Sequence, residues 1–235
     1  MTMRSPFRYF KISPEIIRLA VMLYIRFPQS QRNLEELLHV RDIEISHETV
    51  RYWWNRFGSM FAVELRRKRV NRMRGRKHWR WHLDEAFEEI NGMTHYLWRV
   101  VEHEVEVLES VVTKTRDRNA ALNLLKKSMK RHGRPENIVP DLLRSCGAAL
   151  KDLGRGDDRE MGQWLSSRGE NSHLPFRRRE RAMLRFRHMR TLQKFASVQA
   201  AVHNHFPTKR HLLNHDHDKQ SRATAIAEWR GLFAA

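Results

Sequence analysis

Apolar positions in the N-terminal part of the chain recur every three or four residues, which is the spacing of amphipathic helices. Ser13 and Pro14 suit the first turn of a helix. A second short helix is predicted over residues 30–39, and a third begins after Ser46 and ends at Gly58. The positions expected to face the core of these helices are Ile16, Ile17, Ala20, Val21, Leu23, Tyr24, Leu34, Leu37, Leu38, Val50, Trp53, Trp54 and Phe57.

The polar side of the third helix carries groups that suit base edges and phosphates. These residues are His47, Thr49, Arg51, Asn55 and Arg56. Three short helices with a tight turn before the last are typical of a helix-turn-helix, although an ordinary three-helix bundle has the same pattern. The polar residues favour the helix-turn-helix and hence double-stranded DNA as a partner.

After residue 78 the pattern changes to the alternation of β-strands. Three consecutive strands are predicted over residues 79–90, 94–102 and 105–116. The pair Asn91-Gly92 is typical of a tight hairpin turn, so the first two strands should be antiparallel neighbours.

Helical spacing returns after Asp117, which suits a helix cap, and lasts to about Gly133. Residues 137–139 form a short predicted fourth strand, and residues 142–153 a helix. Residues 176–205 are basic and helical in pattern. The order β-β-β-α-β-α predicts an α/β fold with a sheet flanked by helices, and by itself it allows several such folds.

Composition adds a strong positive charge to this picture. The 235 residues include 45 Lys or Arg and 27 Asp or Glu, which gives a formal net charge of +18 and a pI of about 10.9. Such a balance favours a polyanionic partner, and charge alone does not choose among DNA, ribosomal RNA and a membrane surface. Nine of the basic residues lie within residues 66–80, a predicted mobile arm along a phosphate backbone. Its leading residues are Arg66, Arg67, Lys68 and Arg69.

Cys146 is the only cysteine, which excludes an intramolecular disulfide and favours a reducing compartment. The N-terminus lacks the apolar core of a signal peptide, and no apolar run reaches the ~20 residues needed to span a bilayer. We therefore expect a cytoplasmic protein without a membrane partner. Five histidines near the C-terminus lack regular ligand spacing, so we expect them at a helix end and in a solvated tail rather than in a zinc site. They are His203, His205, His211, His215 and His217.

Three acidic residues occupy distinctive settings. Asp84 lies in WHLDEAF, Asp141 follows the apolar run IVP, and Glu170 opens a strongly basic segment. Three carboxylates brought together can hold two divalent cations, the apparatus that cuts and joins phosphodiester bonds. Each acid alone would be a surface residue, so the reading depends on all three meeting in the fold.

The order and surroundings of these acids resemble DDE transposases of bacterial insertion sequences, specifically the IS-six (IS-twenty-six-like) group. The resemblance runs from about Phe7 to Trp229. It implies an RNase H-like catalytic domain, with Asp84, Asp141 and Glu170 as metal ligands for two Mg²⁺ ions, which Mn²⁺ can replace. Arg177, seven residues after the glutamate, stands where the family has a basic residue that grips DNA.

The resemblance also implies the organisation of the chain and its partners. Residues 1–62 would form the helix-turn-helix DNA-binding domain, 63–78 a basic linker, 79–206 the DDE domain with C-terminal helices, and 207–235 a tail. The DNA partners would be terminal inverted repeats and target DNA. A homodimer or larger synaptic complex, associated with the bacterial nucleoid, would join them.

The sequence departs from the family pattern around the acids. Pro140 and Leu142 flank Asp141, and Glu88 with Glu89 interrupts a strand that is normally more apolar. Proline donates no hydrogen bond to a strand neighbour, so we expect the geometry beside Asp141 to differ from that of the family. The alternative to an active transposase is therefore a catalytically degenerate, transposase-derived DNA-binding protein. A basic RNA-associated structural protein, which would not need the carboxylates, is the other alternative.

Overall fold

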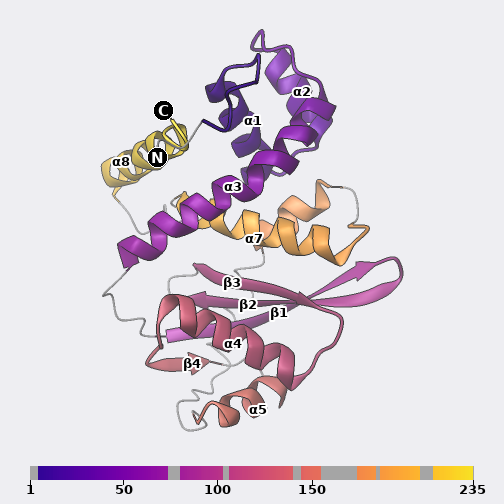
Figure 1. The fold of residues 1–235 in the computed structure, drawn as a ribbon, viewed down its shortest axis with the longest axis vertical. Helices are drawn as coiled ribbons and strands as arrows, with labels where there is room; N and C mark the ends of the chain where they lie inside the picture. Colours follow the sequence, from indigo (N-terminus) through magenta and orange to yellow (C-terminus); the bar gives the residue numbers. More distant parts are fainter. Residues whose placement is uncertain are drawn as a thin grey trace.

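A computed structural model shows a four-stranded sheet with helices on both sides, and most of the helices lie above it in the view of Figure 1. It describes residues 5–73, 80–102, 106–139, 144–154, 174–183, 186–206 and 214–234. Within these ranges no helix is both long enough and apolar enough to cross a membrane.

The first two helices begin where the sequence predicts. In α1 (Pro14–Arg26) the Ser13 hydroxyl accepts a hydrogen bond from the Ile16 N–H, and in α2 (Gln31–His39) Ser30 caps in the same way. Most of the predicted core positions of the N-terminal helices are buried. Leu37 is an exception at 39% exposed, because Leu34 and Leu38 already fill the inward face of this short helix.

The third helix is much longer than predicted. Helix α3 (His47–Met73) continues through Gly58, so the expected end at this glycine is wrong. Gly58 is buried beneath the Trp54 ring, where an added Cβ would lie 2.6 Å from ring carbons, so the glycine serves packing. The helical cost of one glycine is only about 1 kcal/mol. The basic arm is thus the end of a helix as far as Met73, and residues 74–79 lie outside the described ranges.

The sheet has the strand order β3-β2-β1-β4. Strands β1 (Arg80–Ile90), β2 (Met93–Glu102) and β3 (Val107–Thr113) form an antiparallel meander. Strand β4 (Asn137–Val139) is parallel to the start of β1. The predicted Asn91-Gly92 turn is confirmed, with φ values of 53° and 75° that suit this pair in a two-residue hairpin.

Helices cover both faces of this mixed sheet. Helices α4 (Arg118–His132) and α5 (Arg144–Asp152) lie on one face, and α7 (Met189–His205) covers the other (Figure 1). The Asp117 carboxylate caps α4 through the Ala120 N–H. The predicted α/β class, a mixed sheet flanked by helices with an all-α N-terminal region, is confirmed.

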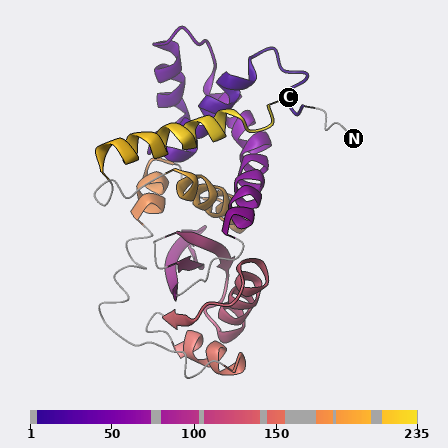
Figure 2. The same cartoon turned by 90° about the vertical axis from the view of Figure 1, so that its left-hand side faces the viewer.

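The C-terminal segment is not the solvated tail that was predicted. Residues of α8 (His215–Arg230) pack beside the N-terminal helices, away from the sheet (Figure 2). The Trp229 indole N–H donates to the Arg18 carbonyl oxygen, and the Arg18 guanidinium donates to the Leu232 carbonyl oxygen, each at 3.0 Å. Burial of Trp229 and Leu232 supplies the driving force that the polar sequence around them concealed.

One hydrophobic core joins the N-terminal helices to the sheet. It contains residues of α1, α2, α3, α7 and α8 together with four sheet residues. The sheet residues are Ala86, Ile90, Leu97 and Val112. A second core, between the sheet and helices α4 and α5, includes Trp81, Leu83 and the buried Cys146. The division into domains at residues 62, 78 and 206 stays a prediction.

Candidate active site and DNA-binding surface

Asp84 lies near the middle of β1 and is only 5% exposed. Its neighbours Trp81 and Leu83 lie in the core beneath α4 and α5, whereas Ala86 belongs to the core that includes α7. Because successive strand residues point to opposite faces, Asp84 faces α7. The central strand thus holds a buried carboxylate on a rigid support.

A buried arginine stands opposite this carboxylate. Arg99 of β2 is the register partner of Asp84 and is 2% exposed. Burial lowers the pKa of Arg99 to about 10, while the negative charge of Asp84 opposes that shift. Burial also lowers the pKa of His203 on α7 to about 4, with the charges of Arg99 and Arg26 adding to the effect. The layer between the sheet and α7 therefore contains buried ionisable groups whose pKa values depend on one another's charge.

The other two predicted ligands, Asp141 and Glu170, lie outside the described residues. Strand β4 is described as far as Val139, which is the register partner of His82 on β1. Among the described residues no group of three His, Cys, Asp or Glu side chains could hold a metal ion. The meeting of the three carboxylates therefore stays a prediction.

Arg177 belongs to a short helix, residues 174–181, and contacts the far part of β1. Its Nη1 donates to Glu88 at 2.7 Å and to Glu180 at 2.8 Å, and its Nη2 donates to the Phe87 carbonyl oxygen at 2.7 Å. The predicted DNA contact of Arg177 is untested, and in this structure the guanidinium is engaged within the protein. Glu88, which the sequence marked only as an interruption of the strand, is its buried partner.

The setting of Glu88 changes its protonation. Burial raises the pKa of Glu88 from its ordinary 4.5 to about 9, and the hydrogen bond and charge of Glu180 add to this, while Arg177 opposes it. The Glu88 carboxyl is therefore mainly protonated at pH 7.

Glu88→Gln, which imitates the neutral acid, should change the pH dependence of stability. A carboxyl with a raised folded pKa binds its proton more tightly in the native state, so wild-type stability should fall as pH rises from about 4.5 to 9. The variant has no such carboxyl, so its free energy of unfolding relative to that of wild type should increase from about pH 4.5 to 9. Urea unfolding at pH 5, 7 and 9 measures it, with the exposed neighbour in Glu89→Gln as the control. Parallel curves for wild type and Glu88→Gln would contradict the shift.

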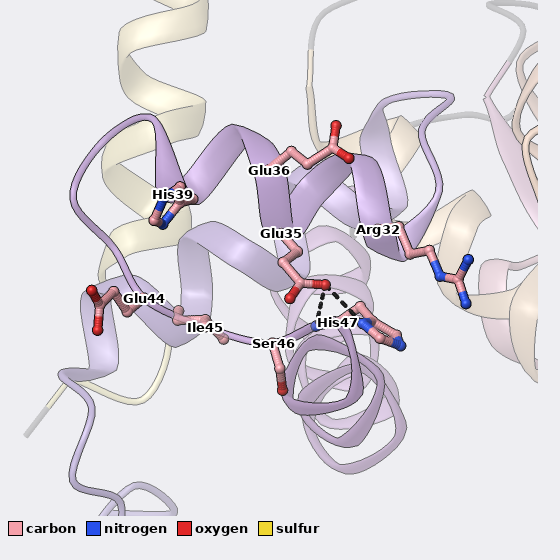
Figure 3. Close-up of a pocket in the computed structure, with 8 residues that line it drawn as sticks. All are labelled: Arg32, Glu35, Glu36, His39, Glu44, Ile45, Ser46 and His47. Carbon is pink, nitrogen blue, oxygen red and sulfur yellow. Dashed lines mark hydrogen bonds and ion pairs between the residues drawn. The ribbon is translucent and has the colours of Figure 1, made fainter.

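The start of α3 carries three predicted DNA-reading residues. The Glu35 carboxylate accepts hydrogen bonds from the His47 backbone N–H at 3.0 Å and pairs with its ring Nδ1 at 2.7 Å (Figure 3). The His47 ring contact is the main cause of a lowered Glu35 pKa. Thr49 contacts the Ser46 hydroxyl, and Arg51 is exposed and pairs with Glu48 at 3.4 Å. This end of α3 faces solvent beside a pocket lined by Arg32, Glu35, Glu36, His39, Glu44, Ile45, Ser46 and His47.

The next turns of α3 are tied more closely to the protein. Asn55 accepts hydrogen bonds from the Lys194 ammonium of α7, at its backbone oxygen (2.9 Å) and its side-chain oxygen (3.3 Å). The Arg56 guanidinium lies over the rings of Phe10 and Phe57. Both residues are exposed, and both have internal contacts that a DNA partner would have to replace.

The basic residues at the end of α3 are partly engaged as well. Arg66 donates to the Ala62 carbonyl oxygen, and its burial lowers its pKa. Arg67 pairs with Glu64 at 2.8 Å and stays exposed. Arg69 pairs with Glu106, which precedes β3. Lys68 is half-buried on the same stretch of helix.

The histidines near the C-terminus have separate environments. His203 and His205 lie in the last turn of α7, as predicted, and the His205 ring contacts the Ala225 carbonyl oxygen of α8 at 2.8 Å. His215 and His217 are exposed in the first turn of α8, and His211 lies outside the described residues.

Comparison with known proteins identifies the family of this chain. Residues 78–209 match the family described as the DDE domain, of the IS240 type of transposase. The chain belongs to the DDE transposases of bacterial insertion sequences, in the IS6 family.

Two relatives illustrate this membership. The chain is 27% identical over 144 residues to the transposase for the insertion sequence-like element IS431mec of Staphylococcus aureus (strain Mu50). It has the same identity over the same length to the transposase of IS257 in transposon Tn4003 of Staphylococcus aureus. The match covers 61% of this chain and 62% of each relative's length. A solved simian T-cell lymphotropic virus intasome, in complex with PP2A regulatory subunit B56 gamma, is 15% identical, with a TM-score of 0.38, over 59% of this chain and 51% of that chain.

Proposed function

We propose that this protein is a DNA transposase that cleaves the 3′ ends of an insertion sequence and transfers them to target DNA. The observation that carries the proposal is the buried Asp84 on the central strand of a DDE domain. Its reaction would be a two-metal phosphoryl transfer, with Asp84, Asp141 and Glu170 as the ligands.

Strand pairing supports the second ligand. Val139 pairs with His82, and Asp141 lies two residues beyond Val139, as Asp84 lies two residues beyond His82. Neighbouring strands are about 4.8 Å apart, and strand residues two apart point to the same face. Continued parallel pairing would therefore bring Asp141 beside Asp84 on the face toward α7.

The position of helix 174–181 supports the third ligand. Glu170 precedes the first residue of this helix by four positions, a span of at most about 14 Å. The same helix contacts the Phe87 carbonyl oxygen through Arg177, and Phe87 lies three residues, about 10 Å, from Asp84 on β1. The helix that follows Glu170 in the chain is thus held to the strand of Asp84, which supports Glu170 as the third ligand.

The chemistry of Asp84 fits a divalent metal ion. Carboxylate oxygens are the hard ligands that Mg²⁺ prefers, and the strand holds this one without freedom to swing away. Two bound ions would activate the attacking oxygen and stabilise the leaving oxygen.

Removal of the metal tests the proposal. Purified protein should join a labelled terminal-repeat oligonucleotide to plasmid DNA in Mg²⁺ or Mn²⁺, and chelation by EDTA should abolish joining while DNA binding persists. Denaturing gels measure joining, and a mobility shift measures binding. Binding without joining in either metal would reject the proposal and support the catalytically degenerate DNA-binding protein instead. The buried cation Arg99 opposite Asp84 is the observation that favours this second function, because it already pairs with the ligand's charge.

We further propose that α3 reads the terminal inverted repeats through His47, Thr49, Arg51, Asn55 and Arg56. Basic residues near its other end, Arg66, Arg67, Lys68 and Arg69, would contact phosphates. The exposed start of α3 supports base reading, because a helix presented by its N-terminal residues is the geometry that enters a major groove. Joining two element ends to a target requires a homodimer or a larger synaptic complex.

Arg51→Ala should weaken binding to the terminal repeat by about 1–3 kcal/mol and leave binding to random DNA nearly unchanged, because base contacts carry sequence preference. Neutralising Arg67 together with Lys68 should weaken both equally and flatten the salt dependence. Fluorescence anisotropy against both DNAs over a salt series measures these effects. Lys126→Ala, an exposed change on α4, is the charge-matched control. Equal losses on both DNAs from Arg51→Ala would reject the reading role of α3.

A further inference from the structure

Helix 174–181 lies between the catalytic sheet and the N-terminal helices and is fixed by two arginines. Arg177 and Arg179 are two residues apart, so they point about 200° apart around the helix axis. Arg177 contacts β1 and Arg179 contacts α1. The short helix therefore connects two elements that the sequence assigns to different functions.

The contact with β1 is made near the far end of that strand. Strand β4 pairs only with Arg80–His82, so beyond this point the outer edge of β1 has no strand partner among the described residues. Arg177 donates to the Phe87 carbonyl oxygen and binds the Glu88 side chain one residue later. Helix 174–181 is thereby held to the strand that carries Asp84.

The contact with α1 is almost completely buried. Arg179 is 1% exposed, and its Nε donates to the Tyr24 carbonyl oxygen at 2.6 Å. Tyr24 lies in the last turn of α1, where carbonyl groups lack partners within the helix and attract positive charge. The guanidinium also stacks over the Tyr24 ring at 4.2 Å.

Burying the Arg179 guanidinium at this contact has a large desolvation cost. The two terminal nitrogens of Arg179 are buried without a hydrogen-bond acceptor among the residues that the structure describes. A well-packed apolar side chain often stabilises such a site at least as well as a buried charge. What the guanidinium adds is direction, because one hydrogen bond and one stacked ring fix the helix against α1.

We propose that Arg179 is a positioning residue for strand transfer: it locks helix 174–181 to α1 while Arg177 locks the same helix to β1. The DNA-reading helices and the strand of Asp84 are then held in one geometry. The expected effect on strand transfer rests on the proposed transposase activity. The connection of helix 174–181 to α1 and β1 rests only on the contacts described above.

Arg179→Met tests the proposal, because methionine fills the buried space without the directed contacts. Strand transfer from pre-bound terminal-repeat DNA should fall about 10- to 100-fold, as misplacement by about 1 Å does elsewhere. The Kd for the repeat should stay within about threefold, because α3 is untouched. Arg179→Lys, which keeps the charge over the ring, should recover part of the rate. Arg178→Met removes the same charge from the exposed side of the helix and should match wild type.

Hydrogen exchange separates this proposal from the proposed function. Terminal-repeat DNA should slow amide exchange in helix 174–181 and β1 of wild type and Arg178→Met, and not in Arg179→Met. If wild type binds DNA but joins none, the transposase proposal fails and the exchange pattern alone decides on the link. Equal protection in all three proteins, or equal strand transfer by Arg179→Met and Arg178→Met, would overturn the role of Arg179.

Discussion

Asp84→Asn should lower strand transfer by about 10³-fold or more, since loss of one ligand charge removes several kcal/mol of metal-dependent transition-state stabilisation. The side chain keeps its shape, so the terminal-repeat Kd should stay near that of wild type. The oligonucleotide-joining assay, run beside a binding assay, measures both quantities.

Two controls make this loss interpretable. Glu89→Gln removes one carboxylate charge from the exposed side of the same strand and should leave joining intact. Thermal unfolding of Asp84→Asn checks the fold, because Arg99 loses the opposite charge that faces it in the buried layer. Equal joining by wild type and a folded Asp84→Asn protein would exclude Asp84 from the chemistry.

Phe61→Ala should lower the free energy of unfolding by about 3–5 kcal/mol. The Phe61 ring is fully buried and lies 5.3 Å from the Trp229 ring and 6.0 Å from the Phe57 ring, centroid to centroid. Its removal leaves a cavity between α3 and α8 in the larger core. Urea unfolding followed by tryptophan fluorescence and circular dichroism measures the change, and Val63→Ala, at a site 60% exposed, is the control.

The same experiment tests the unity of the core. Because the core joins the N-terminal helices to Ala86, Ile90, Leu97 and Val112 of the sheet, both probes should report one transition that shifts together. Two separate transitions, with only the first moved by Phe61→Ala, would show that the helices unfold independently of the sheet.

The sequence predicted the elements whose signals are local. Ser13 and Asp117 cap the helices they were expected to cap, because each side chain needs only the N–H groups of the next turn. The Asn91-Gly92 turn likewise needs only its own positive φ angles.

The errors occurred where distant packing overrides local preference. Gly58 has the local character of a helix end, yet the Trp54 ring covers it and the helix continues. The segment after residue 213 is rich in polar residues, yet Trp229 and Leu232 insert into a core formed by α1 and α3. A single sequence contains no direct record of which partner will cover an isolated tryptophan.

The sequence predicted the three acids of the candidate site, but it did not predict the residues that contact this part of the fold. Arg99 was within reach of the sequence, because a two-residue turn at Asn91-Gly92 pairs residues whose numbers are symmetric about it and so sets Asp84 opposite Arg99. No comparable local pattern predicts the contacts of Glu88 and Arg179. Their contacts join β1 and α1 to helix 174–181, elements far apart in the chain that only the folded structure brings together.

Helix α3 is continuous from His47 to Met73, so its two ends lie a fixed distance apart. Twenty-seven helical residues extend for about 40 Å as one rod. One turn of B-DNA measures about 34–36 Å. A duplex aligned with this rod and touched at both of its ends would be covered for more than one full turn, with the distance between the two contacts fixed by the helix. Inserting half a turn of DNA between two such contact points would place them on opposite sides of the duplex. If α3 contacts DNA as proposed, its length would therefore fix the spacing of contacts within a binding site.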